Sequence, residues 1–224
     1  MSILSLENIT YGYIDGNSKR TILNELSYTF EKGKFYTILG PSGSGKTTLL
    51  AIAGGLEKTQ QGKVCYENKD INEIGLGKYR RNYLSFVFQQ FNLIPYLTAV
   101  ENVVNVMEIT DNDVPKPYYK TALNLLHQFG IVQTKAERSI FKLSGGEQQR
   151  VAIARGLATN VAVILADEPT GNLDTGTERE IIKIFRLLAT QYNKCVIVVT
   201  HSDDIASLSD VQLKLEGGRL VERM

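Results

Sequence analysis

The chain has 224 residues, of which 43% are hydrophobic and 22% are charged. This length suits one large domain and is too short for two ordinary ones, so we expect a single core with an inserted subdomain. Lysine and arginine total 25 against 24 acidic residues, which gives a net charge of +1. This balance excludes a protein that attracts nucleic acid or anionic lipid through an overall basic field, so any acidic ligand has to be held locally.

The apolar segments and the cysteines indicate the compartment. The longest apolar runs, residues 161–166 and 195–199, are far shorter than a bilayer span. The start of the chain, MSILSLENIT, lacks the basic and then apolar pattern of a signal peptide, so we expect a soluble, cytoplasmic protein. Cys65 and Cys195 lie in apolar or β-like stretches without CxxC spacing, which favours buried thiols over a disulfide or a metal site.

The first third of the chain predicts strands that lead into a glycine-rich loop. Residues 4–9 and 22–30 alternate as strands do and are joined by the polar stretch 15–20, which predicts a small antiparallel sheet. Residues 35–39 form a short apolar strand that runs into GPSGSGKTT, after which residues 48–53 open a helix.

The middle of the chain has a different pattern. Residues 91–130 read as helical segments broken by Pro95, Pro115 and Pro117. Residues 118–129 carry apolar side chains at helical spacing. We therefore expect a helical insertion here.

The last third returns to alternating helices and strands. The pattern predicts a helix from Ser144, a strand at 161–166, a helix at 177–190 and a strand at 195–200. Continuous apolar strands separated by helices imply a parallel sheet that is covered on both faces. The terminal QLKLEGGRLVE predicts a hairpin that turns at residues 217–218.

The glycine-rich loop predicts a phosphate site. Residues 40–47 match GxxxxGK[ST], in which the glycines let successive backbone N–H groups converge on phosphate oxygens. Lys46 is expected to reach the β- and γ-phosphates of ATP, and the Thr47 hydroxyl to ligate Mg²⁺. The predicted ATP-binding residues of this segment are Gly40, Pro41, Ser42, Gly43, Ser44, Gly45, Lys46, Thr47 and Thr48.

An acidic pair ends the strand VILA and complements the loop. Asp167 is the predicted second metal anchor, and Glu168 is the predicted general base that orients and deprotonates the attacking water. The alternative is a buried strand that happens to end in acidic turn residues. The pair is weak evidence alone and strong evidence beside the phosphate loop.

A second predicted anion site opens the helix that follows Leu143. Ser144 and Glu147 have the spacing of a capping box, which by itself only starts a helix. The pair Gly145 and Gly146 is unusual, because helix formers would be more favourable in a first turn by about 1 kcal/mol each. Glycines there expose backbone N–H groups to an anion, which predicts a second phosphate-binding helix end.

One chain thus has two helix ends suited to phosphate but one lysine loop and one acidic pair. The second helix end therefore needs the nucleotide of another copy. A head-to-tail homodimer, in which residues 144–147 of each chain close on the ATP of its partner, satisfies both sites. Hydrolysis would remove the γ-phosphate contact and let the two halves part.

The motifs GPSGSGKTT, LSGGEQQR, ILADEPTGNLD and VVTH, in this order, resemble the ABC ATPase superfamily over essentially the whole chain. LADEPTGNLD with TAVENV upstream is similar to the branch of macrolide-exporter, lipoprotein-releasing and antimicrobial-peptide-resistance ATPases, the MacB/LolD type, and to the cell-division ABC ATPase. The resemblance implies an α/β fold with a P-loop NTPase (RecA-like) parallel-sheet core, an N-terminal antiparallel β subdomain and an inserted α-helical subdomain. Residues 1–90 and 151–224 would form the first two parts, and about 91–150 the helical part with the signature motif.

The resemblance also implies roles for single residues. Gln89 matches the glutamine that touches Mg²⁺ and water and reports the nucleotide state, with Gln90 as the less favoured neighbour. Asp174 matches an aspartate at the dimer seam, in trans to the ATP. His201 matches the histidine that contacts the γ-phosphate, and Tyr13 matches the aromatic side chain that stacks on adenine.

Each of these roles has a structural alternative. Tyr13 could be a packing residue, since Tyr11 lies two positions away on the same strand face. His201 could stabilise a strand end. His127 lies in an amphipathic stretch outside any motif and is expected to be structural.

The resemblance implies an ATPase with ATP and Mg²⁺ as cofactors. It would drive a separate membrane permease, with an adaptor or accessory subunit as a further possible partner, and lie peripherally on the inner face of the cell membrane. A non-transport clamp that regulates a membrane partner, as in the cell-division complex, is the alternative. A nucleic-acid machine is disfavoured, because the chain is nearly neutral and has neither long coiled-coil arms nor a second cassette.

Overall fold

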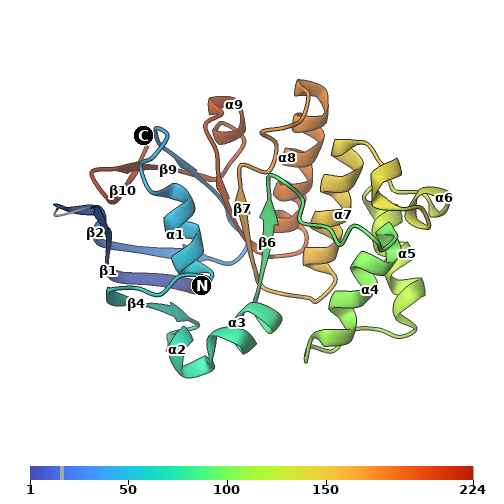
Figure 1. Cartoon of the computed structure of the whole chain (residues 1–224), viewed down its shortest axis with the longest axis horizontal. Helices are drawn as coiled ribbons and strands as arrows, with labels where there is room; N and C mark the ends of the chain where they lie inside the picture. The colour runs from blue at the N-terminus through green and yellow to red at the C-terminus, as the bar shows by residue number, and fades with distance from the viewer. Residues whose placement is uncertain (16–17, 224) are drawn as a thin grey trace.

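The structure is a computed structural model that describes residues 1–15 and 18–223. An antiparallel sheet, a second, mostly parallel sheet and a group of helices follow one another along the longest axis of the molecule (Figure 1). This arrangement is the α/β fold with an antiparallel β part and an inserted helical part that the motifs implied.

The antiparallel sheet is larger than predicted. It has the order β2-β1-β4-β5, built from β1 (Ser2–Asp15), β2 (Ser18–Glu31), β4 (Gln61–Tyr66) and β5 (Lys69–Asp70). The predicted strands at 4–9 and 22–30 are confirmed and extend further, because polar residues still pair across the ladder, as Tyr13 does with Arg20. The expected connection at 15–20 is therefore shorter, and its central residues 16–17 lie outside the described part.

The second sheet has the order β10-β9-β3-β8-β7-β6. All neighbouring strands are parallel except β9 and β10, which form the predicted terminal hairpin through Gly217 and Gly218. The predicted parallel sheet is thus confirmed. Its strands are β3 (Phe35–Leu39), β6 (Leu84–Phe88), β7 (Val163–Asp167), β8 (Cys195–Val199), β9 (Val211–Glu216) and β10 (Arg219–Glu222).

Both faces of this sheet are buried at β3, β7 and β8, which explains the uninterrupted apolar sequences of these strands. Phe35 and Ile164 face the layer of α7 (Gly145–Leu157) and α8 (Thr175–Thr190). The next residue of each strand faces the opposite layer, which contains α1 (Lys46–Ala53) and the antiparallel sheet. Such alternation follows from the two-residue period of a strand.

Cys65 and Cys195 are both buried free thiols, as expected. Burial raises the pKa of each thiol above its ordinary value. Neither side chain is therefore placed to act as a nucleophile.

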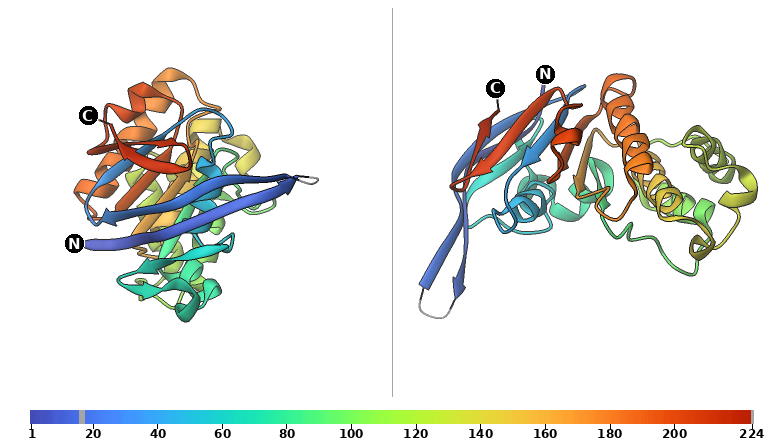
Figure 2. Two further views of the ribbon diagram at one scale, coloured as in Figure 1. Left: turned by 90° about the vertical axis from the view of Figure 1, so that its left-hand side faces the viewer. Right: turned by 90° about the horizontal axis from the view of Figure 1, so that it is seen from above.

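The helical group lies at the far end of the molecule from the antiparallel sheet (Figure 2, yellow and green ribbons). A capping box between Thr98 and Glu101 starts its first helix. Residue 150, the predicted boundary of this part, falls inside α7, which continues beneath the parallel sheet. The elements here are α4 (Ala99–Ile109), α5 (Tyr118–Gln128), α6 (Gln133–Ala136) and a 3-10 helix, η1 (Ile140–Lys142).

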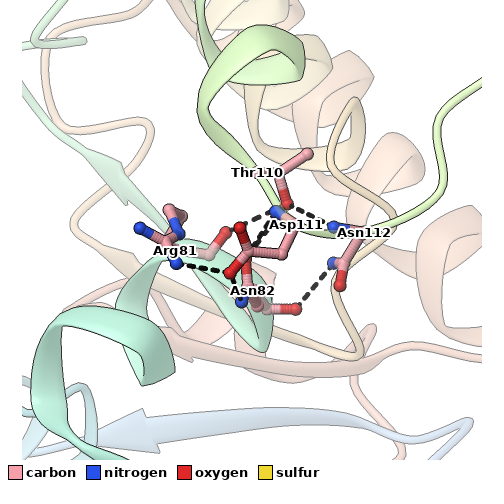
Figure 3. A network of polar contacts seen from close by, with 5 residues as sticks. All are labelled: Arg81, Asn82, Thr110, Asp111 and Asn112. Atoms are coloured by element: carbon pink, nitrogen blue, oxygen red, sulfur yellow. Dashed lines mark hydrogen bonds and ion pairs between the residues drawn. The ribbon is translucent and has the colours of Figure 1, made fainter.

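A polar network joins this helical group to the core at the end of α3 (Leu76–Asn82), which follows the short α2 (Ile71–Ile74). The Asn82 side chain donates to Asp111 Oδ2 at 2.9 Å and accepts the Asp111 N–H at 3.0 Å (Figure 3). Arg81 pairs with the same carboxylate, and the Asn112 amide donates to the Asn82 carbonyl at 2.7 Å. The two bonds to Asp111 give the Asn82 side chain a donor and an acceptor partner, and the residue is only 4% exposed.

Among the described residues, no helix is both long and apolar enough to cross a bilayer. The four-residue helix α9 (Asp203–Ala206) is the next element after β8.

Candidate active site

The parallel register brings most of the predicted site residues to one edge of the core sheet. Phe88 lies opposite Asp167, Asp167 lies opposite Val199, and Val199 lies opposite Ile38. The residues that follow these strands therefore meet at their carboxyl ends, which is where α/β sheets bind ligands. The residues collected in this way are Gly40 to Lys46, Gln89, Glu168 and His201.

The Lys46 side chain is bonded to backbone carbonyls of the phosphate loop itself. Lys46 is only 6% exposed, and its Nζ donates to the carbonyl oxygens of Gly40 at 2.8 Å and Pro41 at 3.1 Å. Burial lowers the pKa of Lys46, while the carboxylates of Glu168 and Asp167 act in the opposite direction. The loop thus holds a cation among backbone groups, at the position where the sequence predicts phosphate.

The first turn of α1 is suited to an anion. Gly45 precedes the helix with φ of 101°, a conformation that glycine adopts without strain. No described side chain caps the helix at this end. The backbone N–H groups of the first turn therefore remain available to phosphate oxygens, and the helix dipole favours negative charge there.

Two of the three predicted metal residues touch each other. The Thr47 hydroxyl donates to Asp167 Oδ1 at 3.3 Å, although 120 positions separate them in the chain. Burial raises the pKa of Asp167, and the Thr47 hydrogen bond and the Lys46 charge oppose this shift. A hydroxyl and a carboxylate are the hard oxygen ligands that Mg²⁺ prefers, so this pair fits the ion.

The third predicted metal residue, Gln89, lies at the same edge but is engaged elsewhere. Its Nε2 donates to Asn172 Oδ1 at 3.1 Å. A Cβ at Gly171 would lie 2.8 Å from that nitrogen, so the small residue allows the close approach. Gln90 is exposed. The structure therefore places Gln89 beside the segment that contains Asn172, and its contact with a metal stays a prediction.

The predicted base and the predicted histidine are neighbours. His201 Nε2 lies 2.9 Å from Glu168 Oε1, and this oxygen is buried without an aligned hydrogen bond from any described residue. Burial raises the pKa of Glu168, while His201 and Lys46 lower it. A carboxylate with a raised pKa is suited to accept a proton from water.

A cleft of about 560 Å³ extends from Lys46, Glu168 and His201 to Tyr13. The Tyr13 ring is half exposed and lies edge-on to the buried Tyr11 ring, with 5.3 Å between centroids. Its open face is thus available to a planar ligand. Sequence analysis missed Arg20 and Ile22, which also line the cleft. Only the pairing of Tyr13 with Arg20 across the hairpin could have indicated this position.

The N-terminus of α7 carries the predicted capping box. Ser144 Oγ accepts the Glu147 N–H at 3.3 Å, and Glu147 Oε2 accepts the Ser144 N–H at 2.9 Å. Burial raises the pKa of Glu147, but the Lys135 ammonium and the Ser144 N–H outweigh burial and hold it below its ordinary value. These residues do not line the cleft around Lys46 within the part of the chain that the structure describes.

The glycine pair of this helix has a packing role that sequence analysis did not foresee. A Cβ at Gly146 would lie 2.3 Å from Thr177 Cγ2 of α8, whereas one at Gly145 would be 3.3 Å from its nearest neighbour. Close contact between α7 and α8 therefore requires Gly146. Anion binding remains a prediction for both.

Asp174 caps α8 within its own chain. Its Oδ1 accepts the N–H groups of Gly176 and Thr177, each at 3.0 Å, and its Oδ2 accepts the Thr177 hydroxyl at 2.7 Å. These bonds lower the pKa of Asp174. The carboxylate is exposed, and its contact at a dimer seam stays a prediction.

Comparison with known proteins identifies this constellation. Residues 23–171 match the model of the family described as ABC transporter. The chain belongs to the ABC transporter family. It is the ATP-binding and ATP-hydrolysing subunit of such a transporter, as the order of its motifs predicts.

Relatives cover nearly the whole chain. An ABC transporter ATP-binding protein of Bacillus subtilis, YclH, is 44% identical over 97% of this chain and 95% of its own length. The lipoprotein-releasing system ATP-binding protein LolD of Rickettsia bellii is 40% identical over 97% of both. The ATP-binding cassette MJ0796 of Methanocaldococcus jannaschii, solved as a post-hydrolysis dimer with ADP and phosphate, is 38% identical with a TM-score of 0.89, covering 99% of this chain and 98% of that one.

Proposed function

We propose that this cleft binds ATP with Mg²⁺ and hydrolyses its γ-phosphate. The backbone of residues 40–48 and the Lys46 ammonium would hold the phosphates, and the exposed Tyr13 ring would stack on adenine. Thr47, Asp167 and Gln89 would hold Mg²⁺, which when bound neutralises charge on the phosphate oxygens. The observation that carries the proposal is the contact of Thr47 with Asp167 beside the buried Lys46 amine.

Glu168 is the proposed general base. Its carboxylate would orient a water molecule and accept its proton as the water attacks in line. His201, whose Nε2 lies 2.9 Å from that oxygen, would donate to the γ-phosphate at the same point. Gln89, at the end of β6, would contact Mg²⁺ and the same water molecule.

We propose that the site is completed by a second copy of the chain. The capped end of α7 does not line the Lys46 cleft of its own chain, as far as the described residues show. Residues 144–147 and Asp174 would therefore face the nucleotide of the partner in a head-to-tail dimer. The relative MJ0796 is dimeric with its nucleotide, which supports this pairing.

We further propose that the dimer drives a separate permease from the inner face of the cell membrane. The similarity to a lipoprotein-releasing system protein over 97% of the chain supports an exporter of lipid-anchored or amphipathic cargo. An adaptor or accessory subunit would belong to the permease side of such an assembly.

Phosphate release from ATP and Mg²⁺ by the purified chain tests the catalytic proposal. Lys46→Ala should lower turnover at least 10²-fold, because it removes a charge that stabilises the transition state. Lys194→Ala is the matched control: Lys194 is another buried lysine, bonded to Asn160 at 3.0 Å, outside the cleft. Wild-type turnover in Lys46→Ala would refute the proposed site.

A further inference from the structure

Gln149 of α7 is fully buried and reaches the segment that carries the proposed base. Its Nε2 donates to the Pro169 carbonyl at 2.6 Å. Its Oε1 is buried without a hydrogen-bond partner among the described residues. The single bond to Pro169 therefore fixes the amide, because the opposite orientation would place two oxygen atoms against each other.

Pro169 directly follows Glu168, whose backbone is in an unusual conformation. Glu168 has a φ of 46°, which is uncommon for a residue other than glycine. Its N–H donates to Val199 O of β8 at 3.0 Å, and its carbonyl accepts the Gly171 N–H at 3.1 Å. The Gln149 amide supplies a third hold on this turn, from a different element of the fold.

The bond from Gln149 restricts the position of this turn because its acceptor is the carbonyl of a proline. Its ring fixes φ, so a segment whose carbonyl is anchored has few ways to shift. A displacement of α7 relative to β7 would therefore move Glu168. A displacement of the order of 1 Å at a catalytic group is enough to reduce turnover greatly.

The same helix begins at Ser144, in the turn proposed to close on the partner's ATP. We infer that Gln149 is a positioning residue that links the two ATP sites of the dimer. Closure of the α7 N-terminus on the partner's nucleotide fixes the helix, and Gln149 then fixes the Glu168 turn of its own chain through Pro169. Nucleotide bound in the partner's cleft thus positions the Glu168 that acts on the chain's own nucleotide. The inference rests on the proposed dimer and on Glu168 as the base.

A merely structural glutamine would stabilise the fold without affecting one kinetic constant selectively. Gln149→Met removes the donor while nearly keeping the side-chain volume. Tyr79→Phe is the matched control, because the fully buried Tyr79 hydroxyl donates to the Ala53 carbonyl at 3.0 Å in a part of the core outside the cleft. Both variants leave one buried backbone carbonyl without its donor.

The experiment measures kcat, KM for ATP, the Hill coefficient and the melting temperature of the full chain. Gln149→Met should lower kcat roughly tenfold or more, leave KM within about twofold and reduce the Hill coefficient towards one. Tyr79→Phe should lose comparable thermal stability with wild-type kcat. An unchanged kcat in Gln149→Met, or an equal loss in Tyr79→Phe, overturns the inference.

A second measurement separates this inference from the proposed function. Dimer formation with ATP and Mg²⁺ is compared in Glu168→Gln and in the double variant Glu168→Gln with Gln149→Met. Equal dimerisation of the two supports a positioning role within a closed dimer. Loss of the dimer only in the double variant overturns it, whereas a monomeric Glu168→Gln parent refutes the proposed dimer itself.

Discussion

His201 Nε2 lies 2.9 Å from Glu168 Oε1, although the two side chains extend from the ends of different strands, β7 and β8. The parallel pairing of these strands produces this proximity, since Asp167 is in register with Val199. The base and the histidine of the proposed mechanism therefore form one unit. Their position beside the buried Lys46 amine places this unit where the γ-phosphate is expected.

The first prediction concerns His201. His201→Ala should lower kcat about 10²-fold or more and leave KM for ATP nearly unchanged, because the proposed contact with the γ-phosphate strengthens in the transition state. Steady-state phosphate release measures both constants. His127→Ala, in an exposed position of α5, is the control and should turn over like the wild type. Equal losses in the two variants would contradict the role given to His201.

The second prediction concerns pH and Glu168. Burial raises the pKa of this carboxyl in the folded chain above its value of 4.5 in the unfolded chain. The folded state therefore binds this proton more tightly, and its contribution to stability is fully present below the unfolded pKa and lost as pH rises through the folded pKa. Glu168→Gln should accordingly raise the melting temperature of the nucleotide-free, metal-free chain at pH 7 to 8.

The same comparison has an internal control at low pH. Well below the unfolded-state value of 4.5, the wild-type carboxyl is protonated in both states, so the melting temperatures of the two proteins should converge. A stabilisation that persists undiminished at low pH would show that burial of the charge is not its cause.

The third prediction separates the two glycines of α7. Gly146→Ala should lower the free energy of unfolding by roughly 1–3 kcal/mol, because its Cβ would lie 2.3 Å from Thr177 Cγ2. Gly145→Ala should be neutral or stabilising by up to about 1 kcal/mol, since alanine favours the helix. Denaturant unfolding measures both.

A second-site change tests the stated cause of the Gly146 effect. Thr177→Ser removes Cγ2 and keeps the hydroxyl that donates to Asp174. In that background Gly146→Ala should cost clearly less. An undiminished cost would mean that another contact opposes the methyl group.

The fourth prediction concerns Asp174. Asp174→Ala should lower the free energy of unfolding by about 0.5–2 kcal/mol, because the carboxylate caps α8 through two backbone N–H groups. Asp174→Asn keeps a capping side chain and should retain most of the stability. If Asp174→Asn nevertheless weakens ATP-dependent dimerisation, the charge acts at the dimer seam, and if it does not, the cap is its whole role.

The sequence predicted the elements whose pattern is local. A period or a spacing in the sequence was enough to predict three of them: the strand that leads into the phosphate loop, the capping box at Ser144 and the hairpin at Gly217. Residues 61–88 carry no clear pattern in the sequence, because β4, β5, α2, α3 and β6 are short. Tertiary pairing, rather than propensity, defines them.

Contacts between segments that are distant in the chain could not be predicted from the sequence either. Arg20 enters the cleft because a ladder pairs it with Tyr13, and Gly146 is required because α8 packs closely against α7. Neither feature has a spacing that marks it. Motifs therefore predicted which residues meet at the sheet edge, while packing decided which further residues surround them.

Sedimentation of the Glu168→Gln chain with ATP and Mg²⁺ tests the composite site most directly. The account predicts a species of twice the 25.0 kDa chain mass. Ser144→Asp in that background should restore the single-chain mass, because aspartate still caps the helix but repels the partner's phosphates. Ser144→Asn, an equally good cap without charge, should remain dimeric. A Glu168→Gln chain that stays at 25.0 kDa, or a Ser144→Asp variant that dimerises as well as Ser144→Asn, would contradict the account.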